Sequence, residues 1–429
     1  MNTQSPTLLK NTDLPAAPRA SLLARLGRQL LLPQLGKFTR GELALVEPDG
    51  TRHSFGRRQP GFDVACTLYI DDPQLFADAA FGGTVGAGEA YVRGLWRCDD
   101  LTALVRIFVA NRDVMNALDS GLSAALSRPM LKLFHWANRN SKSGSARNIA
   151  AHYDLGNELY QLMLDDTMAY SCAIFARGDA TLAEASAAKF DAVCRKLDLR
   201  ASDHVLEIGT GWGGFAIHAA QRHGCRVTTT TISKQQRDFA VRKIAELGLS
   251  DRITVLLNDY RELEGQFDKL VSIEMVEAVG AKYLDGYFRH CGRLLKPEGA
   301  MLLQAITLQD QHYARALETV DFIQRHVFPG SFIPSVEALS RSMTRASDFK
   351  IFHLEDIGPH YARTLRAWRE RFFQAIARVR ELGYSDSFIR LWEYYLCYCE
   401  GGFLERQLGT VQMVLTRPEC RREPISVGF

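Results

Sequence analysis

The sequence has few of the features that mark membrane-spanning, secreted or metal-binding proteins. None of its 429 residues lies in a run close to the ~18–20 consecutive apolar residues that span a bilayer. Its start, MNTQSPTLLKNTDLPAAPR, lacks the apolar core and cleavage site of a secretory signal. The nine cysteines are scattered without any CxxC pair, and the eleven histidines show no ligand spacing. We therefore expect a cytoplasmic protein with reduced thiols and no metal.

Net charge is also small. The chain has 52 Lys and Arg against 49 Asp and Glu, a formal charge of +3. So small a surplus argues against a dedicated nucleic-acid-binding protein. The hydrophobic share of 46% and the charged share of 24% are ordinary for globular proteins and exclude a largely disordered chain. The length favours two domains.

The segment from 21 to 35, SLLARLGRQLLLPQL, predicts an amphipathic helix. Leucines recur at helical spacing with Arg25 and Arg28 between them. One interpretation is a helix that lies on a membrane surface. The favoured interpretation is a helix packed on its own domain, because most amphipathic helices are of that kind.

The region before about residue 137 predicts a small N-terminal α+β domain. Residues 37–72 alternate in the manner of strands, and Pro48-Asp49-Gly50 predicts a hairpin turn. Helical patterns follow, namely LFADAAF, AGEAYVRGLW and LTALVRIFVANRDV. The polar run NRNSKSGSARN predicts a linker at 138–148. We thus expect an accessory domain at 1–137 and a catalytic domain at 149–429.

From residue 204 onward, strand and helix patterns alternate. This alternation is typical of a doubly wound, mostly parallel α/β sheet with helices on both faces. The predicted strands are HVLEIGT (204–210), CRVTTTTI (225–232), RITVLLND (252–259), FDKLVSIEM (267–275) and GAMLLQAIT (299–307), followed by FKIFHLEDI (349–357) and GTVQMVLT (409–416).

The loop after the first of these strands predicts a nucleotide site. It reads Gly209-Thr210-Gly211-Trp212-Gly213-Gly214 and opens a helix, and glycines allow a ligand to approach the backbone closely. It also fits the dinucleotide fingerprint, but no acid ends the next strand to hold a ribose. Glu207 instead precedes the loop in the spacing E-x-G-x-G-x-G. That spacing resembles the first motif of S-adenosylmethionine-dependent methyltransferases, with Asp259-Tyr260 placed for the adenine edge.

Longer motifs make the resemblance more specific. The chain resembles cyclopropane-fatty-acyl-phospholipid synthases and mycolic acid cyclopropane synthases over about 148–418, and more weakly over 85–101. The motifs that carry the resemblance are AHYDLGNELYQLMLDDTMAYSCAIF (151–175), SIEMVEAVG (272–280), VFPGSFIPS (327–335) and IGPHYARTLRAW (357–368). The implied fold is a Rossmann-like class I methyltransferase sheet.

The resemblance implies a reaction and its residues. An acyl-chain double bond attacks the sulfonium methyl of S-adenosylmethionine, and a bound bicarbonate takes a proton so that a cyclopropane closes. Cys172, Glu277 and Tyr361 fall on bicarbonate positions, and Tyr153 and Phe328 on aromatic positions beside the reacting carbon. The implied cofactor positions, with Glu207 from the glycine motif, are Tyr170, Ser171, Gly209, Gly211, Thr231, Ile232, Gln236, Tyr260, Arg261 and Ile273.

One position departs from the family pattern. Gln304 stands in Leu302-Leu303-Gln304-Ala305-Ile306 where the family carries a bicarbonate-binding histidine. An amide can hydrogen-bond an anion but cannot carry positive charge or relay a proton as imidazole does. The alternative to a cyclopropane synthase is therefore a fatty-acyl C-methyltransferase that makes methyl- or methylene-branched chains. A protein that binds lipid or cofactor without catalysis is a third interpretation.

The expected partner is a phospholipid membrane surface, met peripherally and reversibly at the cytoplasmic face. Two features support this expectation, each with a structural alternative. An apolar segment at 322–333 suits a cover for an acyl chain, or ordinary core. Arg363, Arg366, Arg369 and Arg371 suit anionic headgroups, or a solvated helix face. A homodimer is an open alternative, and nucleic acid is not expected.

Overall fold

The structure is a computed structural model, and it describes residues 21–119 and 156–425. Tyr153, the predicted linker at 138–148 and the predicted domain boundary near 137 lie outside the described residues. Neither described stretch contains a helix with the length and apolarity that a bilayer crossing requires.

The N-terminal part is a four-stranded sheet with helices. Its strand order is β2-β1-β3-β4, and β1 and β2 form the predicted antiparallel hairpin. The sequence placed Trp96 in a helix, but it opens a short edge strand, because α2 ends at Val92. The elements are α1 (Leu22–Leu35), β1 (Gly41–Val46), β2 (Arg52–Arg57), β3 (Ala65–Ile70), α2 (Gln74–Val92), β4 (Trp96–Cys98), α3 (Leu101–Ala110) and α4 (Arg112–Asp119).

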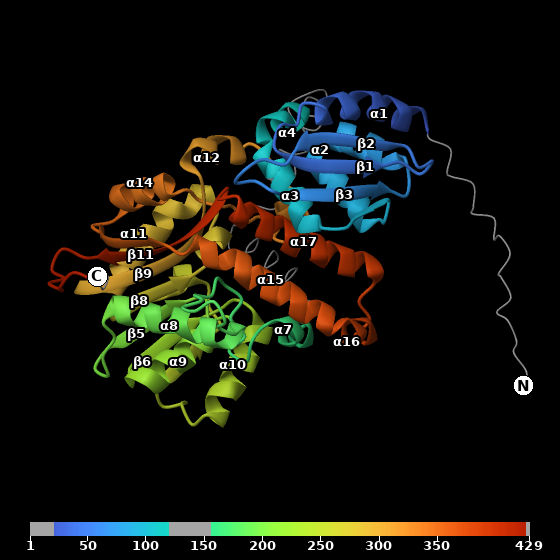
Figure 1. The fold of residues 1–429 in the computed structure, drawn as a ribbon. Helices are drawn as coiled ribbons and strands as arrows, with labels where there is room; N and C mark the ends of the chain where they lie inside the picture. Colours follow the sequence, from blue (N-terminus) through green and yellow to red (C-terminus); the bar gives the residue numbers. More distant parts are fainter. Residues whose placement is uncertain (1–20, 120–155, 426–429) are drawn as a thin grey trace, which may run out of the picture.

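Helix α1 has two apolar faces. One face packs on α2 of its own domain, as the favoured interpretation predicts, and the helices approach so closely that a Cβ on Gly27 would lie 2.3 Å from the carbonyl oxygen of Phe76. The other face points to solvent on the side away from α17 (Figure 1). Its exposed leucines are Leu22, Leu23, Leu26 and Leu30, at 71%, 57%, 44% and 51% exposure.

The second part is the predicted doubly wound sheet. Its order is β10-β11-β9-β8-β5-β6-β7, and every pairing is parallel except the two made by β11. The strand order reverses between β5 and β8, which is where ligands bind in open α/β sheets. The strands are β5 (His204–Ile208), β6 (Arg226–Thr230), β7 (Ile253–Leu256), β8 (Phe267–Ile273), β9 (Leu295–Leu308), β10 (Lys350–Asp356) and β11 (Leu408–Thr416).

Helices cover both faces of this sheet (Figure 1). The first group is α7 (Asn157–Met163), α8 (Leu182–Leu197), α9 (Gly214–His223), α10 (Lys234–Glu246) and α11 (Leu284–Leu294), with short 3₁₀ turns at η1 (Tyr260–Glu262), η2 (Val276–Ala278) and η3 (Ala281–Tyr283). The second group is α12 (Asp310–Ala316), α13 (Phe322–His326), α14 (Val336–Ala346), α15 (Gly358–Gln374), α16 (Ile376–Glu381) and α17 (Asp386–Leu404).

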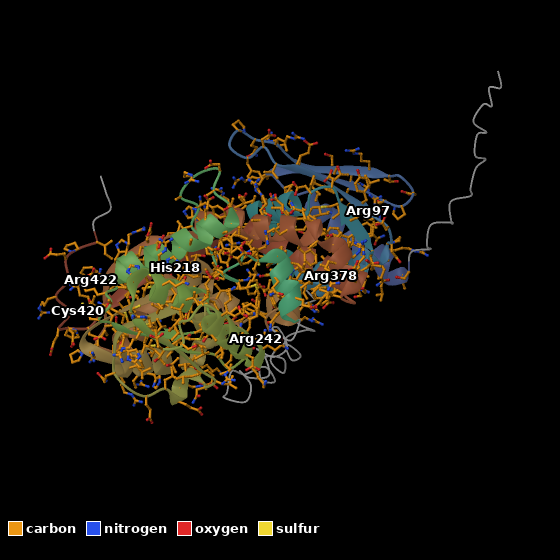
Figure 2. The ribbon with its side chains drawn as sticks, turned by 90° about the horizontal axis from the view of Figure 1, so that it is seen from below. Arg97, His218, Arg242, Arg378, Cys420 and Arg422 are labelled. Carbon is orange, nitrogen blue, oxygen red and sulfur yellow. The ribbon has the colours of Figure 1, made fainter. Side chains whose placement is uncertain are left out.

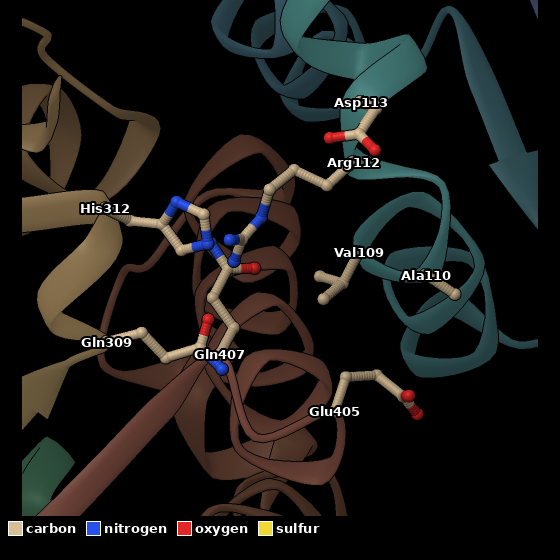
Figure 3. A pocket seen from close by; sticks show the side chains of 8 residues that line it. All are labelled: Val109, Ala110, Arg112, Asp113, Gln309, His312, Glu405 and Gln407. Atoms are coloured by element: carbon tan, nitrogen blue, oxygen red, sulfur yellow. The ribbon is translucent and has the colours of Figure 1, made fainter.

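Helix α17 joins the two parts, because it packs against α2 and α3 as well as against α15 (Figure 1). Tyr91 donates to Glu393 at 2.7 Å, and Arg106 pairs with Glu405 at 2.6 Å. In Figure 2, Arg97 marks the N-terminal sheet, whereas Arg422 lies at the opposite end of the molecule. A polar hollow of about 270 Å³ opens on the same seam (Figure 3); its lining includes Arg112 from α4 and residues after β9 and α17.

Candidate active site

The glycine loop lies at the carboxyl end of β5. Gly209, Gly211 and Gly213 have φ of +104°, +52° and +93°, a region that favours glycine. A Cβ on Gly214, the first residue of α9, would lie 2.6 Å from the carbonyl oxygen of Thr167. The loop therefore needs its glycines both for backbone conformation and for close packing, and it lies at a helix start, where anionic and nucleotide ligands commonly bind.

Glu207 lies under this loop. Its Oε2 accepts from the Thr229 hydroxyl at 2.6 Å, and that hydroxyl lies 2.7 Å from the hydroxyl of Thr210. Burial raises the pKa of Glu207 to about 8. These contacts tie β5, β6 and the loop together, so the carboxyl group braces the loop from below. A direct contact with a cofactor stays a prediction.

The next two strand ends hold most of the other predicted cofactor residues. Thr231 donates to the Oε1 of Gln236 at 2.8 Å, and both side chains are buried beside Ile232. Asp259 accepts from Nε of Arg261 at 2.7 Å, while Tyr260 packs edge to face on Tyr287. Ile273 ends β8 across the switch point. These residues line one edge of the sheet, as a nucleoside site requires.

The carboxylate of Glu274 is the centre of the polar cluster at the end of β8, and sequence reasoning missed it. Its Oε1 accepts from the Cys172 backbone amide at 2.9 Å and from Nε2 of Gln304 at 2.8 Å. Its Oε2 accepts from the Tyr361 hydroxyl at 2.6 Å. Burial raises the pKa of Glu274, and these three donors oppose the rise. The only sequence signal is an acid directly after a buried strand at the sheet's carboxyl edge.

Glu277 was expected to share an anion with Cys172 and Tyr361, but the structure places it differently. Its Oε1 accepts from the Ile306 amide at 2.6 Å. Its buried Oε2 has no hydrogen-bond partner among the described residues. Burial, followed by the charge of Glu274, raises the pKa of Glu277 to about 8. The side chain starts from a 3₁₀ turn, three residues beyond the cluster that it was predicted to join.

Gln304 belongs to a chain of amides that crosses the sheet. Its Oε1 accepts from Nε2 of Gln412 at 2.9 Å, and Oε1 of Gln412 accepts from the ammonium of Lys196 at 2.5 Å. Lys196 pairs in turn with Glu355 on β10. Every donor in the chain points toward Glu274. The amide that replaces the expected histidine is thus oriented by a buried cation.

A second buried lysine lies on the other side of the cluster. Lys189 of α8 is 1% exposed and donates to the Ser171 hydroxyl at 2.9 Å. Burial lowers the pKa of Lys189 to about 8, against the carboxylates of Glu274, Asp165 and Glu207. Sequence reasoning missed this residue too, although a lysine on the apolar face of a helix is a usable signal. It adds positive charge beside the carboxyl groups of Glu274 and Glu207.

Aromatic rings form the wall beside the cluster. The ring centroid of Tyr170 lies 5.0 Å from that of Trp368 and 6.4 Å from that of Phe328. The hydroxyl of Tyr170 lies 2.9 Å from the hydroxyl of Tyr395. Phe328, which was predicted to lie beside the reacting carbon, is part of this wall. Trp368 and Tyr395 belong to the wall too and were not predicted. Cys172 is fully buried, and burial raises the pKa of its thiol well above the usual value. Its contribution is the backbone amide, and the thiol stays neutral.

The four arginines of α15 have partners within the protein. Arg363 donates to the carbonyl of Gly178, and Arg371 donates to that of Leu164. Arg366 and Arg369 both pair with Glu400 on α17. These contacts tie α15 to its neighbours. Arg366 and Arg371 are nevertheless exposed, so a role at anionic headgroups stays a prediction.

The apolar segment at 322–333 is divided among several cores. Phe322 packs at 4.5 Å on Tyr394 and near Gly88, within the interdomain core. Phe332 is buried in the core around α11, and Phe328 alone of these three joins the aromatic wall. Phe322 and Phe332 are therefore core residues, whereas Val327 and Ile323 pack in the same cluster as Phe328, and a cover for an acyl chain stays a prediction.

The sheet order, glycine loop and buried site define a class I S-adenosylmethionine-dependent methyltransferase. A family model described as "Mycolic acid cyclopropane synthetase" matches residues 140–413, and the chain belongs to this family.

Named relatives support this membership. The chain is 36% identical over 414 residues to the tuberculostearic acid methyltransferase of Mycobacterium tuberculosis, covering 94% of each chain. It is also 36% identical over 350 residues to the cyclopropane-fatty-acyl-phospholipid synthase of Escherichia coli, covering 82% of this chain and 87% of the relative. The solved mycolic acid cyclopropane synthase CmaA1 with SAH and CTAB matches with a TM-score of 0.59 and 30% identity, over 63% of this chain and 98% of that one. Lipid modification dependent on S-adenosylmethionine is thereby supported.

Proposed function

We propose that this enzyme transfers a methyl group from S-adenosylmethionine to the double bond of an unsaturated phospholipid acyl chain, and that the direct product is an unsaturated, branched chain. The observation that carries the proposal is a buried carboxylate held by three donors beside an aromatic wall, next to the glycine loop. Alkene methylation produces a carbocation, which needs a dry site, aromatic faces and a nearby base. The N-terminal domain and the named lipid-modifying relatives favour an acyl chain as the acceptor.

Ring closure to a cyclopropane is the second candidate. Two relatives of equal identity carry names for the two different activities, so identity does not choose between them. Gln304 favours the branched product, because its amide is fixed by Gln412 and cannot relay a proton. The histidine position implied by the resemblance is thus filled by an amide that donates to Glu274 and accepts from Gln412.

The test is incubation with S-adenosylmethionine and monounsaturated phospholipid vesicles, followed by proton NMR of the extracted acyl chains. Vinylic methylene or branched-methyl signals support the proposal. Upfield ring-methylene signals support the second candidate, and unchanged chains contradict both. A mass measurement does not suffice, because a cyclopropane and a methylene branch are isomers.

One substitution tests the role of Gln304. We expect Gln304→His to raise the ring fraction of the product, because imidazole can relay a proton. The control is Gln309→His, at an exposed residue just after β9 whose amide bonds the Arg406 carbonyl. An unchanged product ratio in Gln304→His would remove Gln304 from the choice of product.

We also propose that the enzyme works at a phospholipid surface that it meets through α1. The exposed leucine face of α1 (Leu22, Leu23, Leu26 and Leu30) supports this, because such a face inserts into the headgroup boundary of a bilayer. The exposed arginines of α15, Arg366 and Arg371, have partners within the protein, so α1 carries this proposal. A peripheral position at the cytoplasmic face of the membrane and a homodimer stay predictions.

A further inference from the structure

We propose that the carboxylate of Glu274 is the base of this reaction, built into the chain at the place where the family resemblance implies a bound bicarbonate. The inference rests on the proposed function, since a base is needed once a methylated acyl cation has formed. It is carried by the donors around Glu274, by its backbone conformation and by the orientation of the amide chain.

The donors around Glu274 are those that the resemblance assigns to bicarbonate. Cys172 and Tyr361 were expected to donate to that anion, and both donate to the Glu274 carboxylate, at 2.9 Å and 2.6 Å. Gln304 holds the family's histidine position and donates to the same group at 2.8 Å. A planar carboxylate with two oxygens therefore occupies a site suited to a planar oxyanion of similar shape.

The backbone of Glu274 is held in a conformation that favours glycine. Its φ is +50°, and only three other non-glycine residues within 21–119 and 156–425 have a positive φ. The conformation is fixed by its amide, which donates to the Gln304 carbonyl at 2.8 Å. Side chains are strained in this region, and such strain gathers at functional sites. A glycine would sit here without strain, so the position retains a carboxylate against its local backbone preference.

The surroundings favour the ionised form of Glu274. The amide chain is oriented by the ammonium of Lys196, so that each Nε2 group donates onward and the last donates to Glu274. Lys189 adds a second positive charge nearby. Three donors and the charge of Lys189 thus oppose the effect of burial on the carboxylate, and an ionised carboxylate accepts protons.

The donors expected for bicarbonate are already taken. The Cys172 amide, the Gln304 amide and the Tyr361 hydroxyl all donate to Glu274. A second anion would also meet the charge of a buried carboxylate at close range. The chain therefore replaces the expected external base with its own.

The proposed step balances as follows. The π electrons of the double bond form a C–C bond to the methyl carbon, and the C–S bond breaks with its electron pair on sulfur, which releases S-adenosylhomocysteine. An oxygen of Glu274 then takes a proton from a carbon bonded to the cationic centre, and that C–H pair becomes a C=C bond. If the proton comes instead from the new methyl group, the electron pair of that C–H bond joins the methyl carbon to the cationic carbon. This bond closes the three-membered ring. Glu274 is left as a neutral acid and returns the proton after the product leaves.

The same contacts hold Glu274 back from attacking the cation. Ester formation needs a carboxylate oxygen that can move to within bonding distance of carbon. Both Glu274 oxygens are hydrogen-bonded, and the donors come from three elements: the loop at Cys172, strand β9 and helix α15. A pinned carboxylate can accept a proton with little movement, whereas bond formation to carbon would break these contacts.

The experiment measures bicarbonate dependence in wild type, Glu274→Gln and Glu274→Gly. Each is assayed on monounsaturated phospholipid vesicles in buffer purged of carbon dioxide, with and without added bicarbonate. We expect wild-type turnover to be the same in both buffers, and Glu274→Gln to lose at least ~100-fold in both. Glu274→Gly should be equally slow alone and recover at least ~10-fold with bicarbonate, because the vacated donors can then bind it.

Two controls separate a lost base from a lost fold. S-adenosylhomocysteine affinity should stay within ~3-fold of wild type in both Glu274 variants. Glu370→Gln makes the same substitution at an exposed position of α15 and should keep both rate and bicarbonate independence.

Two results would overturn the role of Glu274, and neither confuses it with the proposed function. The first is wild-type turnover that requires bicarbonate, a result that depends on no variant. The second is Glu274→Gln at the wild-type rate. By contrast, wild type that methylates no lipid in either buffer contradicts the proposed function itself.

Discussion

The two sides of the β5–β8 switch point are built by different means. On the β5 side, the glycine loop is made by backbone conformation within six consecutive residues, Gly209 to Gly214. On the β8 side, the Glu274 cluster draws one group each from Cys172, Gln304 and Tyr361, which lie up to 102 positions away along the chain. A local motif thus forms the cofactor side, and long-range contacts form the carboxylate side.

This difference predicts that the two sides fail in different ways. Damage to the loop should remove cofactor binding, whereas damage to the cluster should remove turnover and leave binding intact. The predictions below test this separation, from the largest expected effect to the smallest.

The largest effect is expected from Gly209→Val. Gly209 has φ of +104°, which a β-branched residue does not adopt without strain, and a Cβ there would lie 3.3 Å from Met275. We expect S-adenosylhomocysteine affinity to fall at least ~100-fold by calorimetry. The control is Gly286→Ala in α11, where a Cβ meets open space and affinity should not change. Wild-type affinity in Gly209→Val would mean that the loop does not hold the cofactor.

Tyr361→Phe tests the other side. The substitution removes the donor to Oε2 of Glu274 but keeps the ring, which stacks on Phe403 at 4.5 Å. A hydrogen bond to a charged group contributes about 1.5–3 kcal/mol, so turnover should fall about 10- to 100-fold. Affinity for S-adenosylhomocysteine should stay within ~2-fold. Tyr394→Phe, in the interdomain core, is the matched control and should leave both unchanged. Loss of S-adenosylhomocysteine affinity in Tyr361→Phe would mean that the carboxylate side also contributes to cofactor binding.

The same contrast explains what the sequence alone could predict. The seven strands and the glycine loop are encoded by local patterns, and the structure confirms them within a few residues. Cys172, Gln304 and Tyr361 were correctly grouped, because each lies in a motif of the family. Glu274 was missed because its role depends on partners from three other elements, and no local pattern indicates its φ of +50°. The prediction named Glu277, three residues further along the chain, as the acidic residue of the bicarbonate site.

The partners of charged residues near the cluster were missed for a related reason. Lys189 was not singled out, and the α15 arginines were interpreted as headgroup contacts or as a solvated helix face without their partners in the protein. Their partners come from segments far along the chain, and no periodicity within one helix reveals which face meets a buried carboxylate. Tertiary partners, and not local pattern, decide the role of such charged side chains.

The pH dependence of stability sharpens the contrast between Glu274 and Glu277. Burial raises the pKa of Glu277 to about 8 from 4.5, so between these values the folded state holds a proton that the unfolded state has released. Stability from this group is therefore full below pH 4.5 and is lost as pH rises through 8. Glu277→Gln removes the titration. We expect the difference in unfolding free energy, Glu277→Gln minus wild type, to rise by about 1–3 kcal/mol from pH 5 to pH 8. Denaturant unfolding measures it.

Two features keep the titration of other groups out of the comparison between wild type and Glu277→Gln. Lys189 has its pKa lowered to about 8, so its opposite effect on stability falls above the measured window. Glu207 titrates in the same sense as Glu277 but is present in both proteins, so it cancels in the difference. The control is Glu370→Gln at an exposed position of α15, which should show no trend with pH. A flat difference in Glu277→Gln would mean that Glu277 is ionised in the folded protein.

The smallest effect is expected far from both sides, on α1. Helix α1 lies away from α17 (Figure 1), and Leu22 and Leu26 on it are exposed, so their loss should weaken contact with lipid without touching the chemistry. We expect Leu22→Ser combined with Leu26→Ser to lower affinity for phospholipid vesicles about 3- to 10-fold, because binding scales with the apolar area inserted. Turnover on substrate dispersed in detergent should not change.

Leu247→Ser is the matched control for this substitution. Leu247 is 41% exposed at the end of α10, on the catalytic part of the molecule, and should not affect vesicle affinity. An equal loss in both proteins would mean that exposed leucines act non-specifically, and no loss in either would remove α1 from the membrane contact. A selective loss would separate a third function, docking on the lipid surface, from cofactor binding at β5 and proton removal at β8.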